Sequence, residues 1–158
     1  MITATRFHDF SAGHRVDGHE GKCALLHGHN YRAHFTVVSD SRTALDEVGR
    51  VLDFSVLKSG LCNWLEAHWD HRFLAWEDDS VMTAIMRQTV GQSLRDVLVP
   101  SIVWVPFNPT AENMAEYLLN VVGPEVLRDS GAELISVVID ETRKCSASAS
   151  LETRYKKG

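Results

Sequence analysis

Three histidines in the first part of the chain are spaced so that they could share a metal ion. His27 and His29 are separated by one glycine, and side chains two residues apart leave the same face of an extended segment. His14 follows a β-like segment, so an antiparallel hairpin would bring it beside the other two. Three imidazoles with an open fourth position are typical of a catalytic zinc site. The alternative is a polar turn that contains this spacing by chance, since the chain has eight histidines.

A cysteine lies close to this group. Cys23 precedes His27 by four residues, and its spacing is compatible with three interpretations. It could be a fourth metal ligand that closes the site, or an inert buried thiol. It could also be a general base or nucleophile whose pKa a nearby cation lowers.

Two further groups carry side chains suited to chemistry. Asp70 and His71 are adjacent, and the carboxylate could orient the imidazole if the backbone turns there; a surface dipeptide at a helix end is the alternative. Asp140, Glu141 and Thr142 end an apolar strand. A carboxylate in that place is often solvated, but it could also accept paired hydrogen bonds from an N–H-rich heterocycle.

The elements that must position these residues follow from apolar periodicity. Strands are expected at 2–10, 30–39, 101–107, 134–139 and 146–155, with a histidine-rich loop after the first. One helix should begin near Ser55, and another should begin at Thr110 as its N-cap. A further helix over 80–99 is interrupted by Gly91. This order predicts an α+β fold with an antiparallel sheet.

The composition limits the kind of protein. A chain of 158 residues with 44% hydrophobic and 23% charged residues is expected to form one folded domain, 1–158. The net charge of −5 argues against nucleic-acid binding. No apolar run approaches the length of a membrane span, and no secretory signal is evident. An odd count of three cysteines indicates a reducing, cytoplasmic location.

Six motifs, in order along the chain, resemble those of the 6-pyruvoyl- and 6-carboxy-tetrahydropterin synthase family. They are Phe10-Ser-Ala-Gly-His14, Cys23-Ala-Leu-Leu-His27-Gly-His29, Leu52-Asp-Phe-Ser-Val-Leu-Lys58, Asp70-His71-Arg-Phe-Leu74, Asn108-Pro-Thr-Ala-Glu-Asn113 and Ile139-Asp-Glu141-Thr142. The resemblance implies the tunnelling fold, or T-fold, in which an antiparallel sheet carries two main helices on one face. It also implies a homo-oligomer, a hexamer built as a dimer of trimers, with active sites between subunits.

The resemblance also implies roles for single residues. His14, His27 and His29 would be ligands of Zn²⁺, and Cys23 would be the base that moves protons on the substrate. Asp70 and His71 would complete the catalytic set as a proton relay. Glu141 would anchor a pterin ring, assisted by Thr142 and Thr110.

The short gap between Cys23 and His27 indicates which member of the family the chain resembles. Three intervening residues are similar to the bacterial 6-carboxy-5,6,7,8-tetrahydropterin synthases, lyases that act on 7,8-dihydroneopterin triphosphate in 7-deazapurine (queuosine) biosynthesis. A 6-pyruvoyl-tetrahydropterin synthase is the alternative within the family, and a non-catalytic pterin- or metal-binding T-fold protein is the alternative from another class. A stretch around 77–100 is longer than compact members need and is expected to be an insertion. Arg15, Lys22, Arg143 and Lys144 are candidates for binding the triphosphate.

Overall fold

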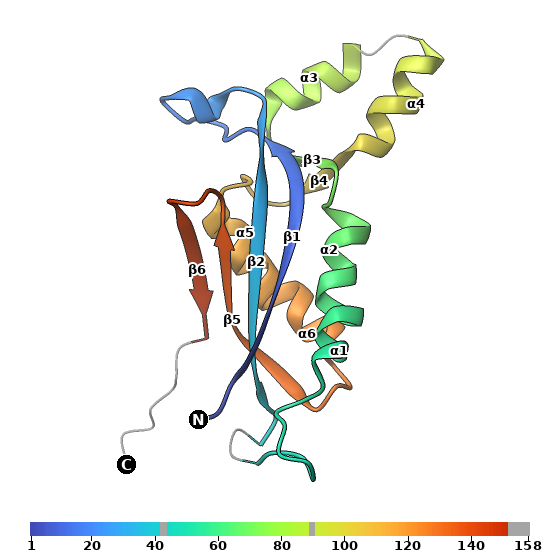
Figure 1. Cartoon of the computed structure of the whole chain (residues 1–158). Coiled ribbons are helices and arrows are strands. Elements are labelled where there is room, and N and C mark those ends of the chain that lie inside the picture. The colour runs from blue at the N-terminus through green and yellow to red at the C-terminus, as the bar shows by residue number, and fades with distance from the viewer. Residues whose placement is uncertain (42–43, 89–90, 152–158) are drawn as a thin grey trace.

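The computed structural model describes residues 1–41, 44–88 and 91–151. One six-stranded sheet runs through the molecule in the order β4-β3-β1-β2-β5-β6 (Figure 1). The strands are β1 (Ala4–His14), β2 (His27–Ser39), β3 (Arg72–Trp76), β4 (Ile102–Val105), β5 (Ala132–Asp140) and β6 (Ser146–Ser150). The helices are α1 (Phe54–Leu57), α2 (Asn63–His68), α3 (Ser80–Gln88), α4 (Gln92–Ser101), α5 (Ala111–Tyr117) and α6 (Gly123–Val126).

The two main helices are each built from two of these elements. A π-helical turn, Lys58–Cys62, joins α1 to α2, and a second one, Leu118–Val122, joins α5 to α6. The first helix buries Leu57, Leu61 and Leu65, and the second buries Met114, Leu118 and Val122. This spacing of about four residues forms one apolar stripe on each helix. Both stripes join the same core as the inward residues of β1 and β2, so both helices cover one face of the sheet.

The α+β class and the T-fold architecture are confirmed, but the sheet is mixed rather than entirely antiparallel. β1, β2, β5 and β6 form antiparallel pairs, whereas β3 runs parallel to both β1 and β4. β3 was not expected from the sequence. The predicted strand 101–107 is confirmed as β4, although Ser101 belongs to α4. Of the predicted strand 146–155, β6 accounts for the first part, and residues 152–155 lie outside the described residues.

The cap of the first helix differs from the prediction. Asp53, not Ser55, is the N-cap, because its side chain accepts a hydrogen bond from Ser55 N at 2.8 Å. Thr110 is confirmed as the N-cap of α5, where its hydroxyl accepts from Asn113 N at 3.3 Å. Both caps fix helix ends that lie next to motif residues.

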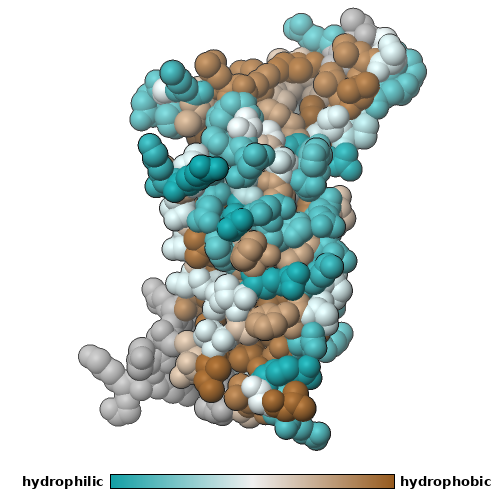
Figure 2. Space-filling view, viewed as in Figure 1, coloured by the Kyte–Doolittle hydropathy of each residue, from teal (hydrophilic) through white to brown (hydrophobic). Residues whose placement is uncertain are grey.

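The stretch expected to be an insertion contributes α3 and α4 at one end of the molecule (Figure 1). Gly91 has a φ of 98°, so it cannot continue a right-handed helix. Figure 2 shows apolar side chains gathered at this end, where Val81, Ile85, Leu94 and Val97 are exposed. Among the described residues, no helix combines the length and apolar character that a membrane span requires.

Candidate metal and substrate site

The hairpin of β1 and β2 brings the three predicted ligands together. His14, the last residue of β1, pairs directly with His27, the first residue of β2. His29 lies two residues further along β2, on the same face. The ligand atoms of the three imidazoles all lie within 4.8 Å of one another, and the Nε2 atoms of His14 and His27 are 3.0 Å apart. Within the described part of the chain, this is the one such group of three or more metal-binding side chains.

Backbone carbonyls orient two of these rings. His14 Nδ1 lies 2.7 Å from the carbonyl oxygen of Pro109, and His27 Nδ1 lies 2.7 Å from that of Leu25. Each Nδ1–H can therefore donate to a carbonyl, which leaves the Nε2 lone pair free to point at its neighbours. His29 Nε2 is buried and has no hydrogen-bond partner. A metal ion would satisfy this atom, so the donor set fits one.

The electrostatics of the cluster favour the neutral form of His14 and His29. Burial lowers the pKa of His14, and the nearby His27 and His29 lower it further. Burial also lowers the pKa of His29, again with a contribution from His27. Glu141 opposes both shifts without reversing them. Neutral imidazole is the form that binds metals, so these lowered pKa values favour binding of a metal cation.

Glu141 follows β5 and turns back toward the histidines. Its Oε1 atom lies 3.8 Å from Nε2 of both His14 and His29. Its backbone N–H donates to the carbonyl of Cys145 at 3.1 Å, which closes the turn between β5 and β6. The carboxylate is therefore placed at the edge of the histidine cluster by the end of the sheet.

A cavity of about 320 Å³ is lined by several of the predicted residues, and Glu141 links it to the histidine group. Cys23, Thr110 and Glu141 line it together. Cys23 is not a member of the histidine group, and it comes from the loop between β1 and β2. The arrangement places a thiol, a hydroxyl and a carboxylate around one volume, which is large enough for a heterocyclic ring.

Asp70 and His71 lie elsewhere on the sheet. Asp70 Oδ1 accepts a hydrogen bond from Ser11 N, and Asp70 Oδ2 lies 2.8 Å from His71 Nδ1. Burial would raise the pKa of Asp70, but these hydrogen bonds outweigh it and hold that pKa below its usual value. His71 adopts a left-handed backbone conformation with φ 56°. The backbone turn at His71 lets the Asp70 carboxylate orient the imidazole. The sequence interpretation in which the two residues act together required such a turn.

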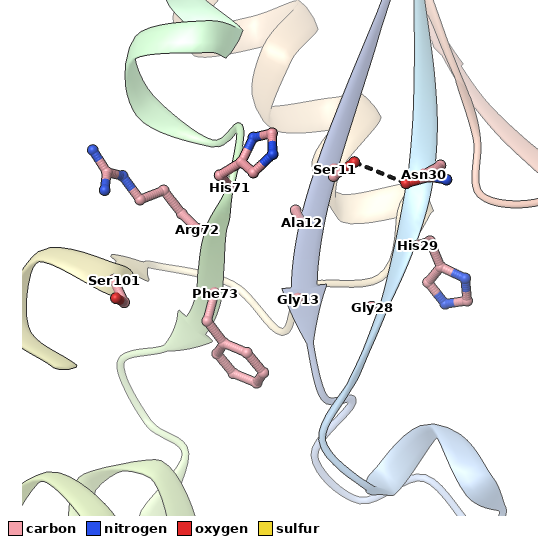
Figure 3. A pocket seen from close by; sticks show the side chains of 10 residues that line it. All are labelled: Ser11, Ala12, Gly13, Gly28, His29, Asn30, His71, Arg72, Phe73 and Ser101. Atoms are coloured by element: carbon pink, nitrogen blue, oxygen red, sulfur yellow. Dashed lines mark hydrogen bonds between the residues drawn. The ribbon is translucent and has the colours of Figure 1, made fainter. Parts of the chain in front are cut away.

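This pair does not meet the thiol within one chain. His71 has an 83% exposed side chain and borders two open cavities, of about 520 and 740 Å³. His29 also borders the smaller of these, but Cys23 and Glu141 border neither. In Figure 3, His71 stands beside β3 and β1, whereas the ring of His29 points away on the far side of β2.

Comparisons with known proteins decide the family. The model of the 6-pyruvoyl tetrahydropterin synthase family matches residues 3–152. A 6-carboxy-5,6,7,8-tetrahydropterin synthase of Rickettsia typhi is 34% identical over 145 residues, which cover 92% of this chain and 97% of the relative. Another of that name, from Synechocystis, is 34% identical over 118 residues, covering 73% of this chain and 92% of the relative. The chain belongs to the 6-pyruvoyl tetrahydropterin synthase family.

Solved structures agree with this assignment. An uncharacterized protein of Wolinella succinogenes superposes with a TM-score of 0.81 at 25% identity, covering 96% of this chain and 98% of the other. The 6-pyruvoyl tetrahydropterin synthase of Caenorhabditis elegans superposes with a TM-score of 0.60 at 24% identity, over 95% of each chain, which shows the shared fold. The family resemblance found in the motifs is confirmed by the family model and the relatives.

In this family member, two of the predicted residues have surroundings that differ from the expected ones. Thr142 borders the open cavity near Asp70 rather than the cavity that Glu141 lines. Its hydroxyl accepts from Lys144 N at 3.1 Å. Arg15, a candidate for binding phosphate, has a side chain only 10% exposed and is paired with Asp79 and Asp17, so it is not free to meet a ligand.

One residue at the site, Tyr31, was not predicted. Tyr31 lies two residues after His29 on β2, and its hydroxyl is 3.2 Å from His14 Nε2. Burial raises the pKa of Tyr31, so the phenol stays protonated. The same alternation that pairs His27 with His29 could have identified it. Cys145 also lines the cavity with Cys23, a place that its closeness in sequence to Glu141 allows, although a structural role was expected.

Proposed function

We propose that this protein is a zinc-dependent 6-carboxy-5,6,7,8-tetrahydropterin synthase that acts on 7,8-dihydroneopterin triphosphate in queuosine biosynthesis. Family membership and the names of the relatives support an enzyme of the pterin synthase type. The observation that carries the proposal is the joint placement of Cys23 and Glu141 around one cavity beside three converging histidines. A binding protein would need the histidines or the carboxylate, but not a thiol at the same cavity.

The metal site in this proposal uses His14, His27 and His29. The convergence of their ligand atoms and the unpartnered Nε2 of His29 support a metal ion held by these three side chains. Bound there, Zn²⁺ would act as a Lewis acid on side-chain hydroxyls of the substrate and lower their pKa.

The chain's own residues would then orient the substrate and move its protons. Glu141 would accept hydrogen bonds from the amino and ring N–H groups of the pterin, which fixes the ring in the cavity. With the ring fixed, the substrate side chain would face Cys23. Its Sγ atom, as thiolate, would remove a proton from that side chain. Thr110 lines the same cavity and offers a hydroxyl to the ring.

In this proposal, Asp70 and His71 take part in catalysis only when subunits assemble. Because one chain keeps them away from Cys23, we infer that they serve the site of a neighbouring subunit in a homo-oligomer, a hexamer of two trimers. His71 is exposed and held by Asp70, which suits a proton donor presented to another chain. We also infer a cytoplasmic location, consistent with three cysteines that are free of disulfide bonds.

The proposal is tested by incubating the zinc-loaded protein with 7,8-dihydroneopterin triphosphate and identifying products by mass spectrometry. We expect 6-carboxy-tetrahydropterin together with acetaldehyde and triphosphate. Cys23→Ala should abolish product formation, whereas the matched variant Cys62→Ala, in a buried helical position away from the cavity, should retain it.

The same experiment separates the alternatives. A 6-pyruvoyl product would instead show that the protein is a 6-pyruvoyl-tetrahydropterin synthase. Tight pterin binding without any product, unchanged in Cys23→Ala, would show a binding protein and contradict the enzyme.

A further inference from the structure

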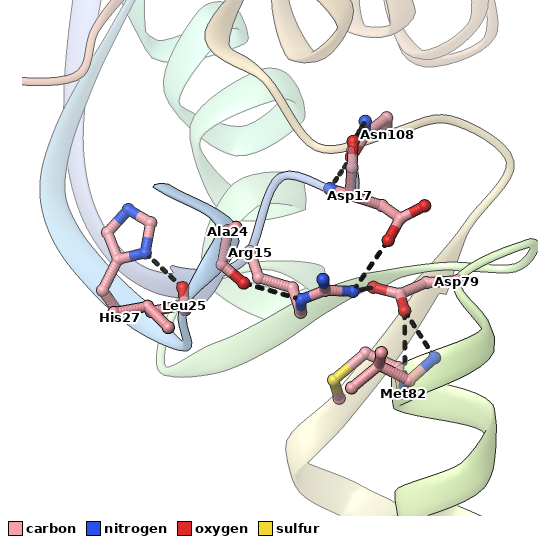
Figure 4. A network of polar contacts seen from close by, with 9 residues as sticks. Arg15, Asp17, Ala24, Leu25, His27, Asp79, Met82 and Asn108 are labelled. Atoms are coloured by element: carbon pink, nitrogen blue, oxygen red, sulfur yellow. Dashed lines mark hydrogen bonds and ion pairs between the residues drawn. The ribbon is translucent and has the colours of Figure 1, made fainter. Parts of the chain in front are cut away.

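The loop that carries Cys23 is held by a buried ion pair that the proposed chemistry does not use. Arg15 follows His14 directly, and its guanidinium meets the carboxylate of Asp79 (Figure 4). The side chains are 10% and 1% exposed, respectively. Asp79 stands just before α3, at the start of the stretch expected to be an insertion. The ion pair therefore connects the stretch 77–100 to the residue that directly follows His14, a proposed metal ligand.

The guanidinium also holds the backbone next to Cys23. Arg15 Nε donates to the carbonyl of Ala24 at 3.0 Å, and Val16 N donates to the carbonyl of Cys23 at 2.8 Å. The carbonyls of Cys23 and Ala24 are thus held by hydrogen bonds from the consecutive residues Arg15 and Val16. Because the planar guanidinium binds in fixed directions, the position of Arg15 sets the position of the Cys23 backbone.

Asp79 is itself rigidly placed. Its Oδ1 atom accepts from Val81 N at 2.9 Å and Met82 N at 3.1 Å, as an N-cap of α3 does. Its Oδ2 atom faces Arg15. The carboxylate of Asp79 thus caps the start of α3 with one oxygen and binds the Arg15 guanidinium with the other.

A second anchor ties the same loop to the segment before α5. Arg15 also donates to Asp17 Oδ1 at 3.1 Å. The side chain of Asn108 accepts from Asp17 N at 3.0 Å and donates to Asp17 O at 2.9 Å. The loop is therefore fixed on two sides, by α3 through Asp79 and by the segment before α5 through Asn108.

We propose that Asp79 is a positioning residue for Cys23, acting through Arg15, so that the first helix of the stretch 77–100 determines where the reactive thiol stands. This inference rests on the proposed function and extends it. Asp79 is not among the residues that line the Cys23 cavity, so it acts on the backbone that presents the thiol and not on the substrate.

The test uses Asp79→Asn in the full-length zinc-loaded protein. The amide oxygen can still cap α3, but the negative charge facing Arg15 is lost. Asp78→Asn is the matched control, because Asp78 is exposed. Alkylation by iodoacetamide is followed by peptide mass spectrometry, with the exposed Cys145 as internal reference. Zinc content, kcat and KM are measured on the same samples.

We expect the ratio of Cys23 to Cys145 alkylation rates to rise about tenfold in Asp79→Asn, because the released loop opens locally. We expect kcat to fall about 10- to 100-fold from a displaced thiol. KM and zinc content should stay near those of the wild type, since Glu141 and the histidines do not move. A loss of stability alone would not change the alkylation ratio well below the unfolding temperature.

Arg15→Lys is a second variant that keeps a charge for Asp79. A lysine cannot reproduce the guanidinium fork that also binds Ala24, so the same changes are expected, and this variant carries the test if Asp79→Asn does not fold. Alkylation ratios equal to that of Asp78→Asn would overturn the proposal. If the wild type forms no pterin product, the proposed function fails, yet the alkylation ratio still decides whether Asp79 positions the loop.

Discussion

The three histidines act as a unit because the geometry of one hairpin sets all of them. His29 is the most informative of the three, since its buried Nε2 has no hydrogen-bond partner. We predict that His29→Ala reduces bound zinc from about one ion per chain to a small fraction of that, because two imidazoles hold the ion poorly. Metal analysis after dialysis measures this. His68→Ala, which removes an exposed histidine at the end of α2, should keep its zinc; equal zinc in both variants would contradict the ligand assignment.

The lowered pKa values of His14 and His29 predict a pH-dependent stability of the metal-free protein. Both rings bind protons less readily in the folded chain, so the unfolded chain takes up more protons as pH falls. Their contribution is therefore complete above the ordinary histidine pKa of 6.5 and decreases as pH falls below it. Thermal unfolding of the metal-free wild type and His29→Ala, between about pH 7.5 and 5.5, measures this.

The difference in Tm between the two proteins isolates the contribution of His29. We expect the stability of the wild type, relative to the variant, to decrease toward the lower pH. A Tm difference that is independent of pH would contradict the electrostatic description of the site.

At this scale, the sequence predicted the three histidines but missed Tyr31, which lies on the same face of β2, and the buried ion pair of Arg15. His27 and His29 follow from alternation along β2, and the pairing with His14 follows from a hairpin. The closeness of Cys145 to Glu141 in sequence allowed a place at the cavity, but only the turn in which its carbonyl accepts from Glu141 and Thr142 fixes it there. The buried role of Arg15 depends on Asp79, which is distant in sequence.

At the scale of elements, the close approach of β1 and β2 decides whether the site forms. A Cβ added to Gly28 would lie 2.9 Å from the carbonyl oxygen of Ala12. Because that oxygen belongs to the partner strand, the strands themselves would have to move apart. We predict that Gly28→Ala destabilises the protein by about 1–3 kcal/mol and weakens zinc binding, since the residue lies between the proposed ligands His27 and His29.

Chemical denaturation and zinc titration measure these two effects. Gly21→Ala is the matched control, because a Cβ there meets only the side chain of His19, at 3.2 Å, and no backbone atom of another strand. Wild-type stability and zinc affinity in Gly28→Ala would show that the hairpin tolerates a wider separation.

The elements that local patterns define were predicted, and the element that depends on distant pairing was not. The apolar stripes of the two main helices can be read from residue spacing. β3 has only five residues and pairs in parallel with β1 and β4, so the contacts that make it a strand come from other parts of the chain. The Asp53 cap was missed because Asp53 and Ser55 are both good capping residues, and only the contact between them distinguishes the two.

At the scale of the whole molecule, one chain holds the residues of the proposed catalytic set in separate places. Cys23 and Glu141 border one cavity, whereas Asp70 and His71 border others. The sheet face that carries Asp9 and Ser11 also carries exposed Phe7 and lies opposite the helices. A closed assembly of identical subunits can bring such separated groups together at each interface. The sequence predicted this assembly through family resemblance alone, since no single-chain pattern shows which groups meet across subunits.

Subunit complementation tests this arrangement. Cys23→Ala and His71→Ala should each be inactive alone, because each lacks one part of every site. When the two variants are unfolded together and refolded, mixed oligomers should contain some sites with an intact Cys23 from one chain and an intact His71 from another. We predict that pterin synthase activity reappears only in this mixture. Each variant refolded by itself is the control, and a mixture that stays inactive while size-exclusion chromatography shows mixed oligomers would place both residues in the same subunit's site.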